Sequence, residues 1–288
     1  MSKTFRAYHG REVALATKHH KEEVLGPPLL QKVGITLVVP EGLDTDLLGT
    51  FSGEVERPGV SRDVAVKKAC LGMNALGLPL GLASEGSFGP HPQWMFMPVD
   101  HELLAFVDAD QGITVVEQVL STETNYSHIR VSAMDHELMD FLSRAAFPSH
   151  GVVVRPDSGW QPGFLFKGIT DSKTLGEAVE QCIGVSDNGY VHVETDMRAH
   201  MNPSRRAVLR QAAEALGTRL ATPCPACGTP GWGVVDVIRG LLCEECGTKT
   251  TLVCAEVYGC VRCDYQQESP RGDGILKASP EFCPWCNP

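Results

Sequence analysis

The sequence lacks the long apolar segments that membrane insertion and secretion require. None of its 288 residues belongs to an uninterrupted apolar run that approaches the roughly 18 residues of a transmembrane helix. The first residues, Met1-Ser2-Lys3-Thr4-Phe5, lack the apolar core of a secretory signal peptide. We therefore expect a cytoplasmic protein that does not engage a membrane.

The sequence also lacks an excess of positive charge. It contains 25 Lys and Arg against 35 Asp and Glu, which gives a formal net charge of −10. An extended nucleic-acid surface needs clustered basic side chains, so this composition argues against nucleic acid as a partner. A small anionic ligand in a local basic pocket remains compatible with it.

The composition that is present indicates a globular protein with a hydrophobic core, with 43% apolar and 21% charged residues. The length exceeds that of one average domain, so we expect two or three units. The apolar patterns predict an α/β fold, a mixed sheet with flanking helices. We place an α/β domain at 1–147, an α/β extension that packs on it at 148–220, and a Cys-rich module at 221–288.

A basic loop follows the first predicted strand. The apolar run 13–17 is followed directly by Lys18-His19-His20-Lys21, and then by a predicted helix that Gly26-Pro27-Pro28 interrupts. Basic residues at this end of a helix oppose its dipole. The loop is either a solvated charge run or an anion site, in which its Lys and His side chains join backbone N–H groups around a phosphate.

An apolar run further along stops abruptly at small residues with one carboxylate. The run Leu78–Ala83 is followed by Ser84-Glu85-Gly86-Ser87, and two prolines then flank His91. α/β proteins display functional groups in loops of this kind at the edge of the sheet. We predict a loop over residues 81–92, with Glu85 as its functional carboxylate and His91 as an acid–base group or a turn cap.

Ionisable and apolar residues alternate over residues 191–201. A strand here would place the ionisable side chains on one face. They are His192, Glu194, Asp196, Arg198 and His200. This face is either the solvent side of an antiparallel sheet, a metal or phosphate site, or a polar network between domains.

The next predicted helix begins at Asn202-Pro203 and carries Arg205 in its first turn. The charge of Arg205 opposes the helix dipole there. We therefore expect either an anion or an acidic neighbour to compensate it.

Cysteine is concentrated at the end of the chain. Eight of the eleven cysteines form four Cys-x-x-Cys pairs after residue 220. Without a signal peptide, this clustering indicates thiolate metal sites rather than disulfides. Two pairs supply the four ligands of a closed, structural zinc site, and iron–sulfur ligation is the alternative. The predicted ligands of two zinc ions are Cys224, Cys227, Cys243, Cys246, Cys260, Cys263, Cys283 and Cys286.

The spacing of the pairs allows two ways of combining them. Fifteen residues separate the first pair from the second, and nineteen separate the third from the fourth. We favour sequential pairing, which predicts two tandem zinc ribbons, and cross-braced pairing is the other arrangement. Residues 221–288 contain five Lys and Arg against eight Asp and Glu, a balance of −3. This balance favours a protein partner, or packing on the rest of the chain, over nucleic acid.

Two family resemblances follow from these motifs. The whole chain resembles a bacterial family with an N-terminal domain and a Cys-rich tail, which implies no activity. The first 120 residues resemble the inosine/xanthosine triphosphate pyrophosphatase superfamily. That superfamily has a strand and phosphate loop with a Lys, an acidic connection, an Ala- and Lys-bearing helix, and a strand with an acidic residue, Ser and Gly. The matching segments here are 16–21, 50–56, 65–69 and 83–87.

This second resemblance implies a metal-dependent hydrolase acting on a nucleoside triphosphate or a similar phosphorylated small molecule. Glu85, with Glu54 or Glu56, would hold Mg²⁺ through oxygen ligands. The ion would activate a water and neutralise charge on the phosphates. The candidate ligand-binding residues are Lys18, His19, Lys21, Ser84, Ser87, His91 and Arg205.

Two other functions remain open. The chain can be a non-enzymatic adaptor, with an α/β domain that senses a ligand and zinc ribbons that contact a protein. It can also be a hydrolase whose metal centre lies on the 191–201 strand. The ligands of that centre would be His192, Glu194, Asp196 and His200.

Overall fold

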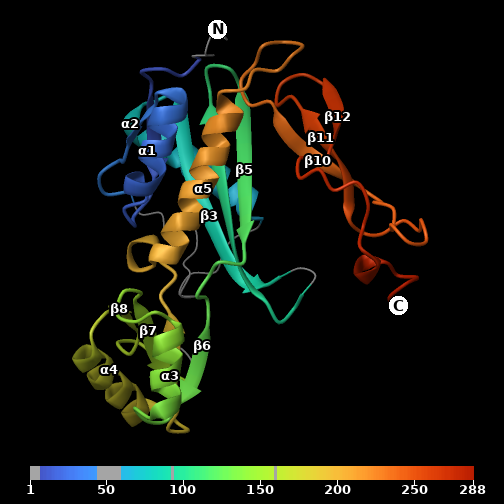
Figure 1. Ribbon diagram of the computed structural model, residues 1–288. Coiled ribbons are helices and arrows are strands. Elements are labelled where there is room, and N and C mark those ends of the chain that lie inside the picture. Colours follow the sequence, from blue (N-terminus) through green and yellow to red (C-terminus); the bar gives the residue numbers. More distant parts are fainter. Residues whose placement is uncertain (1–6, 44–59, 92–93, 159–160) are drawn as a thin grey trace. The chain divides into compact units, whose positions relative to one another are not determined.

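The computed structural model describes residues 7–43, 60–91, 94–158 and 161–288 (Figure 1). Glu54 and Glu56, two of the predicted metal ligands, lie outside the described residues. The chain divides into two compact units, of which one runs from Tyr8 to Leu216 and the other contains Gly217–Pro288. Among the described residues, no helix combines the length and apolar character needed to cross a membrane.

A five-stranded mixed sheet forms the first part of the larger unit, as the α/β prediction expects. The strands lie in the order β2-β1-β3-β4-β5. The strand β1 runs parallel to both of its neighbours, whereas β3, β4 and β5 form an antiparallel meander. The bounds are β1 Glu12–Ala16, β2 Thr36–Val38, β3 Leu80–Pro90, β4 Pro98–Asp108 and β5 Ile113–Ser121.

Two helices connect the parallel strands of this sheet. Helix α1 (Glu22–Val33) leads from β1 to β2, and helix α2 (Ser61–Leu76) precedes β3. The strand β2 lies on one side of β1 and β3 on the other. Right-handed crossovers in opposite directions place the two helices on opposite faces of a sheet, and α2 packs on β1, β3 and β4.

Helix α1 is continuous, although the sequence predicted an interruption at Gly26-Pro27-Pro28. Pro27 and Pro28 lie inside the helix. Their missing N–H groups leave two carbonyls of the preceding turn without helical partners. Leu25, Pro28 and Leu29 are buried, so packing of this face compensates for the lost hydrogen bonds.

The predicted loop over residues 81–92 is largely a strand. The eleven-residue β3 pairs with β4 along its whole length, from Leu80 opposite Asp108 to Pro90 opposite Pro98. Two of its glycines, Gly81 and Gly86, serve close packing rather than a turn. A Cβ added at Gly86 would lie 2.5 Å from Arg205 Nη2 and 2.7 Å from Glu102 Oε1. A glycine is therefore needed where these two side chains meet above the strand.

A four-stranded antiparallel sheet forms the second part of the larger unit, in the order β6-β9-β7-β8. Each of its two helices connects strands that a third strand separates, which is a split βαβ arrangement. This sheet begins at β6, ahead of the predicted boundary at residues 147 and 148. The bounds are β6 His128–Val131, α3 His136–Arg144, β7 Val152–Pro156, β8 Phe166–Ile169, α4 Ser172–Val185 and β9 Val191–Thr195.

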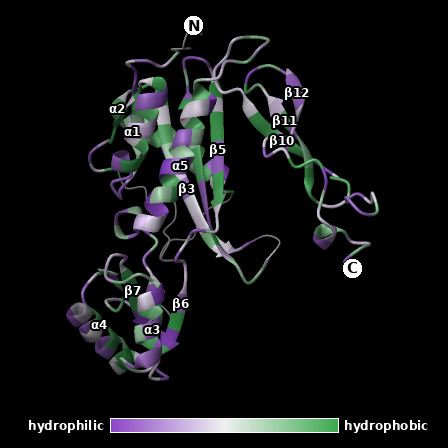
Figure 2. Cartoon of the chain, in the orientation of Figure 1, coloured by the Kyte–Doolittle hydropathy of each residue, from purple (hydrophilic) through white to green (hydrophobic). Residues whose placement is uncertain are grey.

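Both helices of the second sheet begin at an aspartate cap. Asp135 accepts a hydrogen bond from the Leu138 N–H at 3.0 Å, and Asp171 accepts one from the Thr174 N–H at 2.9 Å. Figure 2 shows hydrophilic and hydrophobic residues side by side on α4. Its buried side chains join one core with α3 and the strands.

The strand β9 is shorter than the alternation over residues 191–201 predicts. It ends at Thr195, and a short 3₁₀ helix, Ala199–Met201, precedes α5 (Pro203–Leu220). The predicted Asn cap of α5 is present, because Asn202 Oδ1 accepts a hydrogen bond from the Arg205 N–H at 2.9 Å. Only the first two ionisable residues of the stretch, His192 and Glu194, lie on the half-exposed face of the strand.

The smaller unit contains an antiparallel sheet of three strands, in the order β10-β11-β12. Their bounds are β10 Gly233–Arg239, β11 Val253–Gly259 and β12 Gln266–Pro270. Residues 221–288, all of them described, bury only two aliphatic side chains of the Ala, Val, Leu and Ile type, namely Leu241 and Ala278. The sheet therefore has almost no hydrophobic core of its own.

The contact between β3 and α2 leads to a first prediction. A Cβ at Gly81 would lie 2.6 Å from Met73 Cγ and 2.8 Å from the backbone oxygen of Ala69. Because a backbone atom cannot rotate away, Gly81→Ala should lower the free energy of unfolding by about 1–3 kcal/mol, measured by urea denaturation. The control is Gly176→Ala in α4, where an added Cβ meets no atom within 4 Å. That variant should gain about 0.5–1 kcal/mol, and wild-type stability of Gly81→Ala would contradict the close packing.

Candidate functional site

The carboxyl end of β1 is a topological switch point of the first sheet. The chain continues from β1 to β2 on one side, and β3 pairs with β1 on the other. Open α/β sheets bind ligands outside the carboxyl ends of their strands at such a point. Ala16 lies opposite Ala83 in the register of β1 and β3. The basic loop, which follows β1, and Ser84, which follows Ala83, therefore begin beside one another.

Lys21 reaches from the basic loop to β3. Its Nζ donates a hydrogen bond to Ser84 Oγ at 2.8 Å, and the two residues are 7% and 5% exposed. Burial, and then the positive charge of Arg205, lowers the pKa of Lys21 to about 8, while the charges of Glu102 and Glu85 act in the opposite direction. The structure thus brings two of the predicted phosphate ligands, Lys21 and Ser84, into contact.

Two carboxylates of β4, Asp100 and Glu102, lie on the same face as Ser84. They stand opposite Phe88 and Gly86 in the register of β3 and β4, and every second residue of a strand shares a face. Both are fully buried, and both oxygens of Asp100 and Oε2 of Glu102 lack a hydrogen-bond donor among the described residues. Burial, and then the charge of Glu102, raises the pKa of Asp100 to about 8. Neither carboxylate was among the site residues predicted from the sequence.

Arg205 is held by protein groups rather than presented to a ligand. Its Nε donates to Glu102 Oε1 at 2.5 Å, its Nη1 donates to the Met197 carbonyl, and the residue is 1% exposed. The acidic neighbour that the helix dipole argument allowed is therefore Glu102. Arg205 was also predicted to bind phosphate, and the structure instead makes it the link between α5 and β4.

Glu85 lies on the other face of β3 from Ser84, because adjacent residues of a strand point to opposite faces. It forms an ion pair with Lys68 of α2 and is 4% exposed. Ser87 shares the face of Glu85 by the same alternation. The structure therefore groups Glu85 with α2, and not with the Lys21–Ser84 contact that the resemblance would place beside it.

The histidines of the basic loop lie beside His200. The rings of His19 and His200 are stacked with their centroids 5.1 Å apart, and His20 lies edge-on to His200 at 6.3 Å. Burial, and then the charge of Arg198, lowers the pKa of His200. Lys18, the first residue of the loop, is exposed. His200 thus belongs to the surroundings of the basic loop rather than to the face of β9.

The metal centre predicted on residues 191–201 does not form. His192 Nε2 lies 2.6 Å from Asp157 Oδ1, Asp196 pairs with Arg198 at 2.6 Å, and Glu194 stands between His128 of β6 and Val153 of β7 in the sheet. None of the groups with metal-ligating geometry in the described part of the chain includes His192, Glu194, Asp196 or His200. The early end of β9 explains this, because the later residues leave the strand before they can share its face.

His91 serves the turn after β3, one of the two roles that the sequence allowed. Its Nδ1 accepts a hydrogen bond from the Trp94 N–H at 3.3 Å, and the two rings stack at 4.7 Å. It follows Ser84 by seven residues, which is about 20 Å of extended chain. The structure therefore separates His91 from the Lys21–Ser84 contact.

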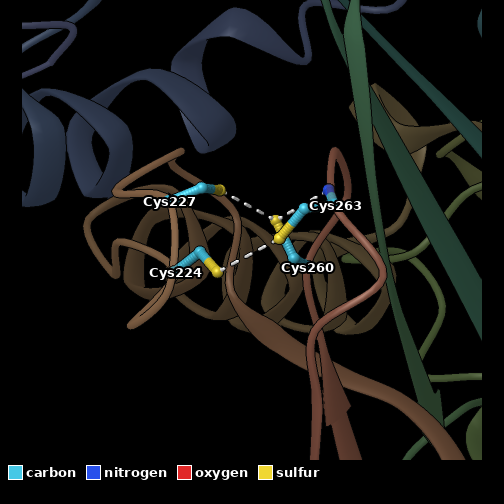
Figure 3. Close-up of side chains that lie close together, drawn as sticks. All are labelled: Cys224, Cys227, Cys260 and Cys263. Atoms are coloured by element: carbon cyan, nitrogen blue, oxygen red, sulfur yellow. Dashed lines mark hydrogen bonds between the residues drawn. The ribbon is translucent and has the colours of Figure 1, made fainter.

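The eight tail cysteines converge in two groups of four, and within each group the sulfur atoms lie within 4.8 Å of one another. Figure 3 shows Cys224 and Cys227 facing Cys260 and Cys263. The second group contains Cys243, Cys246, Cys283 and Cys286. Sequential pairing was wrong, since the first Cys-x-x-Cys pair joins the third and the second joins the fourth.

The three-stranded sheet explains this cross-braced arrangement. The strand β10 leads from the first cysteine pair to the second, β11 returns to the third, and β12 leads back towards the fourth. Since the strands are antiparallel, successive pairs alternate between the two ends of the sheet. A seven-residue strand spans about 23 Å and keeps the two groups apart. The apolar segments 233–239 and 253–259 were the signal that the sequence offered for these strands.

The geometry of both groups fits one tetrahedral ion each. Opposing sulfur atoms lie 3.5 to 4.0 Å apart, and four Zn–S bonds at tetrahedral angles separate sulfur atoms by about 3.8 Å. Hydrogen bonds from Thr229 lower the pKa of Cys227 to about 6, and those from Thr248 do the same for Cys246. These contacts favour the thiolate that binds metal. The two groups can therefore hold two metal ions, compatible with zinc-ribbon-like modules.

Comparison with protein families places most of the chain in one family. Residues 68–288 match the family described as a domain of unknown function, DUF6671. The chain belongs to this family. The match contains β3, β4 and all eight tail cysteines, and the basic loop precedes it. No curated protein matches the chain, so the resemblance to the triphosphate pyrophosphatases rests on the sequence motifs alone.

The buried carboxylates of β4 lead to a second prediction. The pKa of Asp100 is raised from 3.8 to about 8, so between these values the folded protein holds a proton that the unfolded chain releases. Stability should therefore fall as the pH rises through this window. Asp100→Asn removes the ionisation at nearly constant size. Relative to the wild type it should gain about 1 kcal/mol or more between pH values of about 5 and 8.5, measured by urea denaturation.

The control for this measurement is Asp110→Asn. Asp110 is exposed and pairs with Arg11 at 2.7 Å. The free energy of unfolding of this variant should differ from that of the wild type by a similar amount at both pH values. An equally constant difference for Asp100→Asn would show that the buried carboxylate does not take up a proton on folding.

Proposed function

We propose that the larger unit is a hydrolase acting on a phosphorylated small molecule, with nucleoside triphosphates as the substrate class. The observation that carries the proposal is the hydrogen bond between Lys21 and Ser84 at the switch point of the sheet. A lysine, a hydroxyl and the first N–H groups of a helix are the donors that phosphate-binding sites use. On phosphate binding, Lys21 exchanges the Ser84 oxygen for a phosphate oxygen.

The carboxylates of β4 support a hydrolytic role for this site. Asp100 and Glu102 share the face of Ser84, and the raised pKa of Asp100, at about 8, lies close to neutral pH. Groups that titrate near the working pH are suited to general acid–base catalysis. In the proposal the pair accepts the proton of the attacking water, and Arg205 holds Glu102 in position through their ion pair.

The Mg²⁺ site that the resemblance implies is not complete among the described residues. Glu54 and Glu56 lie outside them, and Glu85 is paired with Lys68. One carboxylate already balanced by a lysine does not make a site for a cation that takes several oxygen ligands. We therefore assign the transfer of the water proton to Asp100 and Glu102. Whether Glu85 binds Mg²⁺ is tested below by the Glu85→Gln variant.

We further propose that both cysteine groups bind zinc in a structural role. Four thiolates at tetrahedral separation leave no open position for a substrate, and the separations of 3.5 to 4.0 Å between opposing sulfur atoms fit a single ion rather than a multi-iron cluster. Metal analysis of the purified chain should therefore give two zinc ions per chain. Iron as the main metal would contradict the assignment.

A third prediction tests the hydrolase. The zinc-loaded protein is incubated with a panel of nucleoside triphosphates and Mg²⁺, and release of pyrophosphate and phosphate is measured. Lys21→Met should lower kcat/KM at least about tenfold, because a charged hydrogen bond to phosphate is lost. Lys173→Met is the matched control, since Lys173 is an exposed lysine of α4 whose side chain is 87% accessible, and it should leave kcat/KM unchanged.

Two further results interpret this experiment. Absence of turnover by the folded wild type would contradict the hydrolase. If the wild type is active, Glu85→Gln tests the implied metal role: loss of kcat together with a weaker dependence on Mg²⁺ concentration would assign Glu85 to the metal. An unchanged Mg²⁺ dependence would leave Glu85 as the partner of Lys68 alone.

A further inference from the structure

The two cysteine groups share every strand of the tail sheet. The strand β10 connects the first group to the second, β11 connects the second to the first, and β12 leads from the first towards the second. The first group therefore adjoins one end of all three strands, and the second group adjoins the other end of β10 and β11 and is joined to β12 by residues 271–282. Neither group is a separate ribbon with a sheet of its own.

The sheet buries few aliphatic side chains. Its buried aliphatic side chains are Leu241 and Ala278, both outside the strands. The valines of β10 remain substantially exposed, with Val234 at 37% and Val235 at 44%. A segment with so small a core needs metals or disulfides to fold, so the free energy of metal binding is also the free energy that forms the sheet.

The pairing makes each group costly to close alone. Opposing cysteines are 33 to 43 positions apart in the sequence, and the entropy lost in closing a loop grows with its length. Once one group is closed, the three strands start side by side at that end. Antiparallel pairing of the strands then brings the remaining two Cys-x-x-Cys pairs together at the other end. Most of the entropy that must be lost to form the second group is therefore lost when the first group closes.

We propose that the tail binds its two zinc ions as one cooperative unit, in which either ion assembles the sheet that the other site requires. The proposal deepens the zinc assignment above and rests on it. It states that loss of one group empties both, although the groups lie at opposite ends of the sheet and share no ligand.

The fourth prediction concerns a variant that removes one ligand of the first group. Cys227 is exposed, so Cys227→Ser removes a thiolate without opening a cavity in a core. Independent sites would leave about one zinc ion per chain, held by the second group. Cooperative binding predicts well below one ion after gel filtration of the full-length chain with a mild chelator, measured by elemental analysis.

The control is Cys254→Ser. Cys254 lies on β11 and belongs to neither group, so this variant changes a cysteine of the same sheet without touching a ligand. It should retain two zinc ions. Retention of one ion by Cys227→Ser, together with two by Cys254→Ser, would overturn the cooperativity.

A titration of the unmodified chain gives an independent test. Metal-free protein receives one equivalent of zinc, and native mass spectrometry counts the ions on each molecule. Equal and independent sites would give about half of the molecules one ion, and unequal sites would give more. Cooperative binding predicts mainly empty and doubly loaded molecules, so a predominant singly loaded species would overturn the proposal.

The outcomes separate the inference from the assignment beneath it. A wild-type chain that binds no zinc would refute the zinc assignment itself. A wild-type chain with two ions, whose Cys227→Ser variant keeps one, would refute only the coupling between the groups.

Discussion

The buried ion pair between Arg205 and Glu102 joins parts of the larger unit that are far apart in sequence. It fixes the start of α5 to the middle of β4, and its other donor bond, to the Met197 carbonyl, holds the segment after β9. Removing one partner of such a pair leaves the other charge buried and unpaired, which typically lowers the free energy of unfolding by about 3–5 kcal/mol. The missing side chain of Gly86 provides the space for the pair. The candidate site depends on this arrangement, because Glu102 stands beside Asp100 and close to Lys21.

The strand β3 separates two sets of buried charges. Lys21, Asp100, Glu102 and Arg205 lie on one face, and Lys68 and Glu85 lie on the other. Buried ionic groups are weak evidence for stability, because desolvation offsets much of their attraction. Their concentration at a switch point, with acceptors that lack donors, is more readily explained by a site that handles charge. This placement supports the proposed ligand site at the carboxyl end of β1.

Local features of the chain could be predicted from the sequence, and distant pairings could not. The Asn202 cap acts within three residues and was predicted correctly. The length of β3 was not predicted because it depends on pairing with β4, which lies beyond a turn. The glycines of this stretch were taken as loop residues, whereas Gly86 leaves the space that Arg205 occupies. Asp100 and Glu102 carried a signal, two carboxylates at strand spacing, but nothing local showed that both would be buried. The tail cysteines were predicted from their spacing to converge in groups of four, whereas the way in which the pairs combine depends on the strands between them.

The cross-braced tail also determines what a break in its backbone would do. The segment between Cys246 and Cys260 lies between the second and third pairs, and it carries β11. A cut there leaves each fragment with one half of both cysteine groups. With metal bound, two coordination centres would bridge the fragments, so the polypeptide would be divided without the assembly coming apart. Tandem ribbons cut at the same place would separate as two intact modules.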